Sequence, residues 1–154
     1  MILALALTCL PLRVLAGEIN VVVSIYPLED IAKNIGRERV SVKTLIPAGA
    51  SPHAYEPSPS EIKELSRARL FIKIGAGLEL WAERFVRSAK RDITILDLSE
   101  TMPLIKGVEE HGHGHHSAYS GGEVTVDPHY WLDPILAIKI VDAIAATFIR
   151  IDPG

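Results

Sequence analysis

Cysteine is almost absent from the sequence, with Cys9 as the only example among 154 residues. It falls inside residues 1–16, a segment made mostly of Leu, Ala, Ile and Val that we interpret as a secretory signal. If this signal is removed, the mature chain has no thiol, and hence neither a disulfide nor a thiolate metal site. Any metal ion would then be held by nitrogen and oxygen ligands.

An excess of positive charge and long apolar runs are also missing. Lys and Arg number 16 against 19 Asp and Glu, which gives a net charge of −3 and argues against nucleic-acid binding, since such domains are usually basic. No stretch reaches the roughly 18 apolar residues that a membrane-spanning helix needs. Residues 1–16 end in Val14-Leu15-Ala16, which resembles the cleavage site of a secretory signal. A buried amino-terminal strand or helix is the alternative interpretation of this segment.

Short β-rich runs alternate with helical patterns from residue 17 onward. Apolar runs predict four strands, at residues 21–25, 40–46, 70–74 and 93–97. Apolar residues at helical spacing predict four helices, over residues 27–35, from the Ser58-Pro59-Ser60-Glu61 start, over 78–89 and over 135–151. This order predicts an α/β fold in which a parallel four-stranded sheet is flanked by helices.

Two histidines directly follow prolines in loops that the sequence makes stiff. Pro52-His53 comes after the second predicted strand, and Pro128-His129 lies in the connection after the fourth. Proline restricts its own backbone and that of the residue before it. Because parallel strands present their carboxyl ends at one edge of the sheet, we expect His53 and His129 to lie close together. Imidazole is a common zinc ligand, so the pair predicts a metal site; a hydrogen-bonded loop histidine is the alternative for each.

A run rich in histidine and glycine separates these two loops. Residues 109–122 belong to the long connection 98–133 and contain little apolar material. The run holds four further candidate metal ligands, His111, His113, His115 and His116. We expect a mobile loop that collects zinc with modest affinity, because ordering it costs conformational entropy. A solvated linker without a metal role is the alternative.

The sequence also predicts roles for the two acidic residues near His129 and for the last helix. Asp133 is expected to cap the helix after Pro134, while Asp127 braces its turn, and either could accept the far N–H of a ligand histidine. The helix over residues 135–151 is apolar nearly all round, which is typical of a helix buried on more than one side. We therefore expect a second copy of the chain or a further domain to cover it.

Five stretches form a distinctive combination along nearly all of the chain after Gly17. They are Ser24-Ile25-Tyr26-Pro27-Leu28, residues 45–53 ending in Gly-Ala-Ser-Pro-His, Pro57-Ser58-Pro59-Ser60-Glu61, Gly75-Ala76-Gly77-Leu78-Glu79 and residues 127–134, Asp-Pro-His-Tyr-Trp-Leu-Asp-Pro. With them the sequence resembles the substrate-binding proteins of bacterial zinc and manganese ABC importers, in particular the zinc-binding branch with a His-rich loop.

The resemblance implies a particular architecture. Members of this family have two α/β lobes joined by one long, rigid helix, with the metal in the cleft between them. The two histidines of the amino-terminal lobe correspond to His53 and His129, and the second lobe supplies the remaining ligands. The chain is then interpreted as a signal segment (1–16), an amino-terminal lobe (17–133) and a linking helix (134–154), without the second lobe.

The resemblance also implies a function. It predicts a periplasmic or extracellular, cell-surface-associated receptor, not an enzyme, that captures Zn²⁺, with Mn²⁺ as the alternative, for the membrane permease of an ABC importer. A homodimer through the exposed linking helix is a further expectation. Two other classes stay open: a zinc-dependent hydrolase with an open metal position, which needs a third protein ligand and a general base, and a surface adhesion module.

Overall fold

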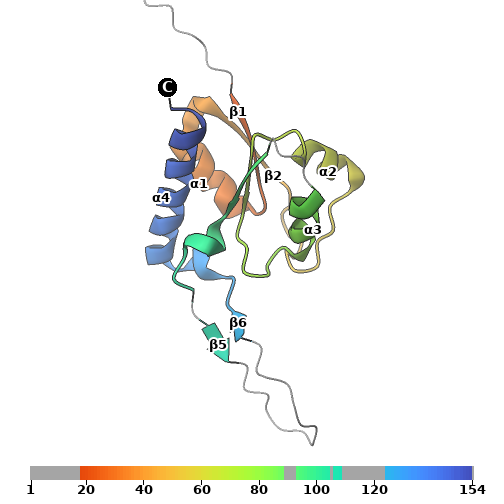
Figure 1. Cartoon of the computed structure of the whole chain (residues 1–154), viewed down its shortest axis with the longest axis vertical. Coiled ribbons are helices and arrows are strands. Elements are labelled where there is room, and N and C mark those ends of the chain that lie inside the picture. The colour runs from red at the N-terminus through yellow and green to blue at the C-terminus, as the bar shows by residue number, and fades with distance from the viewer. Residues whose placement is uncertain (1–17, 89–92, 105, 109–123, 154) are drawn as a thin grey trace, which may run out of the picture.

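A four-stranded sheet lies between two layers of helices in the computed structural model, which describes residues 18–88, 93–104, 106–108 and 124–153 (Figure 1). The strands are β1 (Ile19–Val23), β2 (Val40–Thr44), β3 (Leu70–Lys73) and β4 (Thr94–Asp97). Their spatial order is β2-β1-β3-β4, and every neighbouring pair is parallel. The predicted α/β fold with a parallel four-stranded sheet is confirmed.

The helices cover both faces of the sheet. On one face, α1 (Tyr26–Gly36) packs beside α4 (Pro134–Ile151), whereas α2 (Pro59–Leu65) and α3 (Leu80–Ser88) lie on the other (Figure 1). Three short 3₁₀ turns connect elements, namely η1 (Arg37–Arg39), η2 (Leu98–Thr101) and η3 (Tyr130–Leu132). From β1 the chain continues to β2 on one side, and it then crosses to β3 and β4 on the other side of β1. α/β folds bind ligands outside the carboxyl ends of the strands at the point where the strand order changes direction in this way.

Side chains of the two central strands build a separate core on each face. Val21 and Val23 join the cluster under α1 and α4, whereas Val22 joins the cluster under α2 and α3. In β3, Ile72 belongs to the cluster under α1 and α4, and Phe71 belongs to the cluster under α2 and α3. Because successive strand residues point to opposite faces, burial on both faces requires the continuous apolar runs seen in the sequence.

Two helices begin at the capping residues that the sequence indicates. The Ser58 hydroxyl accepts the backbone N–H of Glu61 while the Glu61 carboxylate accepts the N–H of Ser58, which forms a capping box on α2. Asp133 Oδ1 accepts the N–H groups of Ile135 and Leu136 at 2.7 and 3.4 Å, and so caps α4 as predicted. Both caps fix the helix starts beside the loops that carry the candidate ligands.

The connection after β4 contains a hairpin that the sequence did not predict. Strands β5 (Lys106–Val108) and β6 (Val124–Val126) pair antiparallel, and each is too short to show an alternating pattern. The expected signal segment at residues 1–16 and the whole 109–122 loop lie outside the described residues. The assignment of α4 as a linking helix stays a prediction. Within the described part of the chain, no helix is long and apolar enough to cross a membrane.

Candidate metal centre

The loop that carries His53 follows β2 and leads to α2. Turns within it close through the N–H of Ala50 on the Pro47 carbonyl, 3.1 Å, and the N–H of Ala54 on the Ser51 carbonyl, 3.3 Å. His53 itself is exposed. The loop thus presents an accessible imidazole at the carboxyl edge of the sheet.

The second loop orients its histidine through a carboxylate. Asp127 Oδ1 accepts the backbone N–H of His129 at 2.9 Å and lies 2.8 Å from Nδ1 of the same imidazole. The backbone N–H of His129 and its ring hold the pKa of Asp127 below its usual range. With Nδ1 engaged by the carboxylate, Nε2 is the nitrogen of His129 that remains available to an ion. This is the arrangement that metal-binding histidines commonly use.

The structure brings the two proline-flanked histidines together. The ring centroids of His53 and His129 lie 5.5 Å apart, and the ring planes are tilted by 53°. A tetrahedral zinc ion bound at about 2.0–2.1 Å to one nitrogen of each ring would hold the centroids roughly 5 Å apart. The observed separation is therefore close to what two imidazoles sharing one ion require.

A small hollow adjoins His129. It has a volume of about 160 Å³ and is lined by Leu104, Asp127, His129, Tyr130, Asp133 and Leu136. The ring of Trp131 also lies near this histidine, with the ring centroids 5.3 Å apart. Among the described residues, no group of three or more His, Cys, Asp and Glu side chains is placed to hold a metal ion. The described part of the site is thus a pair of imidazoles.

Buried charges lie at the strand ends near the histidines. Lys73 at the end of β3 is 3% exposed and forms an ion pair with Asp97 at the end of β4. Glu79 is 2% exposed, and its two carboxylate oxygens accept the N–H groups of Ile74 and Gly75, each at 3.0 Å. Burial raises the pKa of Glu79, against the effect of these N–H groups and of the Lys73 charge. These contacts hold the turn after β3 in one conformation.

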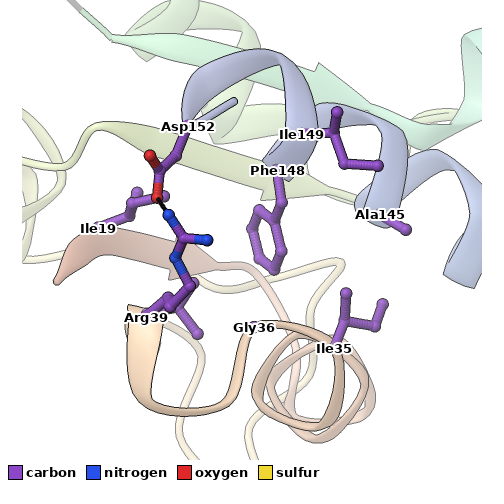
Figure 2. A pocket seen from close by; sticks show the side chains of 9 residues that line it. Ile19, Ile35, Gly36, Arg39, Ala145, Phe148, Ile149 and Asp152 are labelled. Atoms are coloured by element: carbon purple, nitrogen blue, oxygen red, sulfur yellow. Dashed lines mark hydrogen bonds and ion pairs between the residues drawn. The ribbon is translucent and has the colours of Figure 1, made fainter. Parts of the chain in front are cut away.

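A larger pocket lies at the other end of the sheet and has a different chemistry. It measures about 210 Å³ and is lined by Ile19, Ile35, Gly36, Arg39, Val40, Ala145, Phe148, Ile149 and Asp152. Figure 2 shows Phe148 of α4 directed between Ile35 and the Arg39–Asp152 ion pair, whose atoms lie 2.6 Å apart. The lining is mostly apolar and contains no histidine, so this pocket is separate from the candidate metal site.

Comparison with known proteins assigns the chain to a family. Residues 21–154 match the family described as zinc-uptake complex component A, periplasmic. The chain belongs to this family. The family resemblance that the sequence motifs predicted is therefore confirmed.

The names of several similar proteins refer to zinc or manganese. The chain is 34% identical over 138 residues to the manganese-binding lipoprotein MntA of Halalkalibacterium halodurans, covering 89% of this chain and 41% of that protein. It is 32% identical over 137 residues to the high-affinity zinc uptake system protein ZnuA of Bacillus subtilis, covering 88% and 43%. The crystal structure of Zn(II)-bound AdcA from Streptococcus pneumoniae superposes with a TM-score of 0.72 at 29% identity, covering 89% of this chain and 27% of that one. The chain thus spans less than half the length of these relatives.

The structure describes two of the six candidate metal ligands. His53 and His129 meet as expected, whereas His111, His113, His115 and His116 lie outside the described residues. Sequence reasoning did not find the hydrogen bonds of Tyr55 and Tyr130, which hold the two histidine loops to the sheet edge. The available signal was the position of each tyrosine, one or two residues after a candidate ligand.

Proposed function

We propose that this chain captures zinc outside the cytoplasm, with manganese as the alternative, and delivers it to the membrane permease of an ABC importer. The observation that carries the proposal is the pair of imidazoles, 5.5 Å apart, at the carboxyl edge of the sheet. Family membership supports the transport role, since the family is described as a periplasmic component of a zinc-uptake complex. A curated relative named as a lipoprotein supports a periplasmic or cell-surface location.

The donor set favours zinc over manganese. Neutral imidazole suits Zn²⁺, whereas Mn²⁺ prefers more oxygen ligands. The described part of the site offers two nitrogen donors, with the Asp127 carboxylate engaged by His129. We propose that residues 111–116 add weaker zinc binding near the site. A manganese-binding relative keeps Mn²⁺ as the alternative cargo.

Two imidazoles leave a tetrahedral ion incompletely coordinated. We propose that the other ligands come from a second lobe, joined through a linking helix that residues 134–154 form or begin. Water or a second copy of the chain could fill the same positions in the isolated chain. Selectivity for the ion would then depend on how rigidly the two histidine loops are held before the other ligands close on it.

A receptor fits the site better than an enzyme. A zinc hydrolase needs three protein ligands, an open metal position and a placed general base. The described residues bring two candidate ligands together, and the Asp127 carboxylate already orients His129. No described feature favours an adhesion module. We therefore propose a non-enzymatic role in which the metal is cargo.

Calorimetric zinc titration of the purified chain tests the proposal. The titration compares the parent chain, a His53→Ala/His129→Ala double variant, and a variant in which the four histidines of residues 111–116 are replaced by Asn. We expect the double variant to lose the tightest binding event and the Asn variant to lose only weaker ones. If all binding disappears with the 111–116 histidines and none with the double substitution, the proposed site is wrong.

A further inference from the structure

A tyrosine next to each candidate ligand is tied to the edge of the sheet. Tyr130 directly follows His129, is 6% exposed, and donates its hydroxyl to the Ile74 carbonyl at 2.5 Å. Ile74 is the residue after β3 and lies 56 positions earlier in the chain. This hydrogen bond is a direct tertiary link between the loop that carries His129 and the centre of the sheet.

The acceptor of this hydrogen bond is itself held firmly. The Ile74 carbonyl also accepts the backbone N–H of Ser99 at 3.1 Å, and the Ile74 N–H donates to the buried Glu79 carboxylate. Glu79 accepts a second N–H from Gly75, the next residue of the turn. A carbonyl fixed on both sides in this way gives the tyrosine a defined point of attachment.

The loop that carries His53 is held by a tyrosine in a similar way. Tyr55, two residues after His53, donates its hydroxyl toward Glu61 Oε1 at 2.7 Å and lies 3.2 Å from the Leu45 carbonyl just after β2. Glu61 belongs to the capping box that begins α2. The loop that carries His53 is thereby joined both to the end of β2 and to the start of α2.

We propose that Tyr55 and Tyr130 are positioning residues that set the separation of His53 and His129 before a metal ion arrives. This inference rests on the proposed metal-binding function and adds the residues that preorganise it. Both histidines are exposed, and the Asp127 carboxylate orients the His129 ring from within the same loop without tying that loop to the sheet. Without the two anchors, each loop would have to be ordered at the moment of binding, and that cost would be taken from the affinity.

The hydroxyl groups have the protonation state that this role needs. Burial, together with the nearby Glu61, raises the pKa of Tyr55 to about 12. Burial also raises the pKa of Tyr130, with further contributions from Asp97 and Glu79. Both hydroxyls therefore remain donors at neutral pH. Phenylalanine at either position would keep the ring and its packing and remove only the donor.

The test uses the chain in which the four histidines of residues 111–116 are replaced by Asn, so that His53 and His129 are the only histidines left. Tyr130→Phe and Tyr55→Phe are introduced separately into this parent. Ser66→Ala is the matched control, because the Ser66 hydroxyl also donates to a backbone carbonyl, that of Lys63 at 2.8 Å, but before β3 instead of at its carboxyl end. Circular dichroism checks that each variant is folded.

Two measurements are made on each protein. Zinc affinity is obtained by competition with a chromophoric chelator. The number of imidazoles on one ion is obtained with Cu²⁺, which binds nitrogen sites strongly and whose electron paramagnetic resonance spectrum reports coupled nitrogens. We expect two coupled imidazoles in the parent and in Ser66→Ala. For each tyrosine variant we expect about tenfold weaker zinc binding, as for the loss of other groups that orient ligands, and a shift toward one coupled imidazole.

The outcomes separate this inference from the proposed function. Unchanged zinc affinity and two coupled imidazoles in both folded tyrosine variants would overturn the positioning role and leave the metal site standing. A parent that never shows two imidazoles on one ion would overturn the proposed function itself. If Tyr130→Phe does not fold, Tyr55→Phe decides the result alone, since the half-buried Tyr55 hydroxyl contacts the Leu45 carbonyl just after β2 and Glu61 at the start of α2.

Discussion

Asp127 makes two contacts with His129 at the candidate site. One carboxylate oxygen binds both the backbone N–H and the ring of the same histidine, which fixes the orientation of the imidazole. A carboxylate in this position also makes the ring a stronger donor toward a metal ion. The role of Asp127 therefore depends on its charge as well as on its shape.

Asp127→Asn separates charge from shape. The Asn side-chain oxygen can still accept the backbone N–H of His129 and keep the turn, but the negative charge beside the imidazole is lost. We expect zinc binding to weaken by about tenfold, with little change in the free energy of unfolding. Chelator competition and urea unfolding measure the two quantities. Zinc affinity equal to that of the parent would show that Asp127 has only a structural role.

The proximity of the two candidate ligands was predictable from sequence, whereas the contacts that support their loops were not. His53 and His129 each follow a proline after a predicted strand, and both loops lie near the carboxyl edge of one parallel sheet. The hydrogen bond from Tyr130 depends on Ile74, which is far away in sequence, and no local pattern identifies a backbone carbonyl as a distant acceptor. Side-chain anchors of this kind emerge only from the folded geometry.

The turn from β3 to α3 lies next to the Ile74 carbonyl that accepts the Tyr130 hydroxyl. Three consecutive residues, Gly75, Ala76 and Gly77, have φ values of +77°, +52° and +80°. Glycine adopts this left-handed region without the steric cost that a side chain brings. The conformation directs the Ile74 and Gly75 N–H groups onto Glu79.

The two glycines of this turn differ in their surroundings. A Cβ atom at Gly75 would lie 2.0 Å from Oδ1 of Asp97, whereas a Cβ at Gly77 would meet nothing within 4 Å. We expect Gly77→Ala to lower the free energy of unfolding by about 1 kcal/mol from backbone strain. Gly75→Ala should cost about 2–3 kcal/mol, because it adds a clash to the strain. Equal losses in urea unfolding would contradict this account of the turn.

Elements with strong local signals were predicted and the weakest were not. The central strands β1 and β3 contain buried apolar runs, and α4 begins at the Asp133-Pro134 signal. Strands β5 and β6 have three residues each and are separated in the sequence by residues 109–123. Their existence depends on pairing, which a sequence pattern of three residues cannot specify.

For the whole molecule, carboxylates with shifted pKa values determine how stability depends on pH. Lys33 and Thr44 hold the pKa of Glu29 below 4.5, and the hydroxyls of Tyr55 and Ser58 do the same for Glu61. Such groups stabilise the fold above their ordinary pKa, and this stability is lost as the pH falls through the lowered value. Glu79 acts in the opposite direction, because its raised pKa makes ionisation costly in the folded chain.

Glu61→Gln tests the acid side of this dependence. Glutamine does not titrate, and its single acceptor oxygen can keep the capping box by accepting the Ser58 N–H, while its NH2 group faces the Tyr55 hydroxyl in place of an acceptor. We expect the urea midpoint of the variant to fall less steeply than that of the parent as the pH is lowered below about 5. Parallel midpoints for the two proteins from pH 6 to 3 would show that Glu61 does not contribute to the acid sensitivity.

Several large apolar side chains on and just before α4 are exposed. Ile135, Ile138, Val141 and Ile149 are 65%, 60%, 39% and 68% exposed, and Leu132 just before the helix is 73% exposed. Burying one such side chain contributes about 2 kcal/mol, so contact between two of these faces would be favourable. This agrees with the sequence-based expectation of a homodimer, which stays a prediction.

Self-association through α4 should be sensitive to charge on that face. We expect the parent chain to sediment faster as its concentration rises and an Ile138→Lys/Ile149→Lys variant to remain monomeric, because two desolvated charges oppose the contact. Leu80→Lys is the matched control, since Leu80 is 66% exposed but lies on α3, across the sheet. The control should associate like the parent. A parent chain that stays monomeric throughout would mean that this apolar face does not bind a second copy of itself.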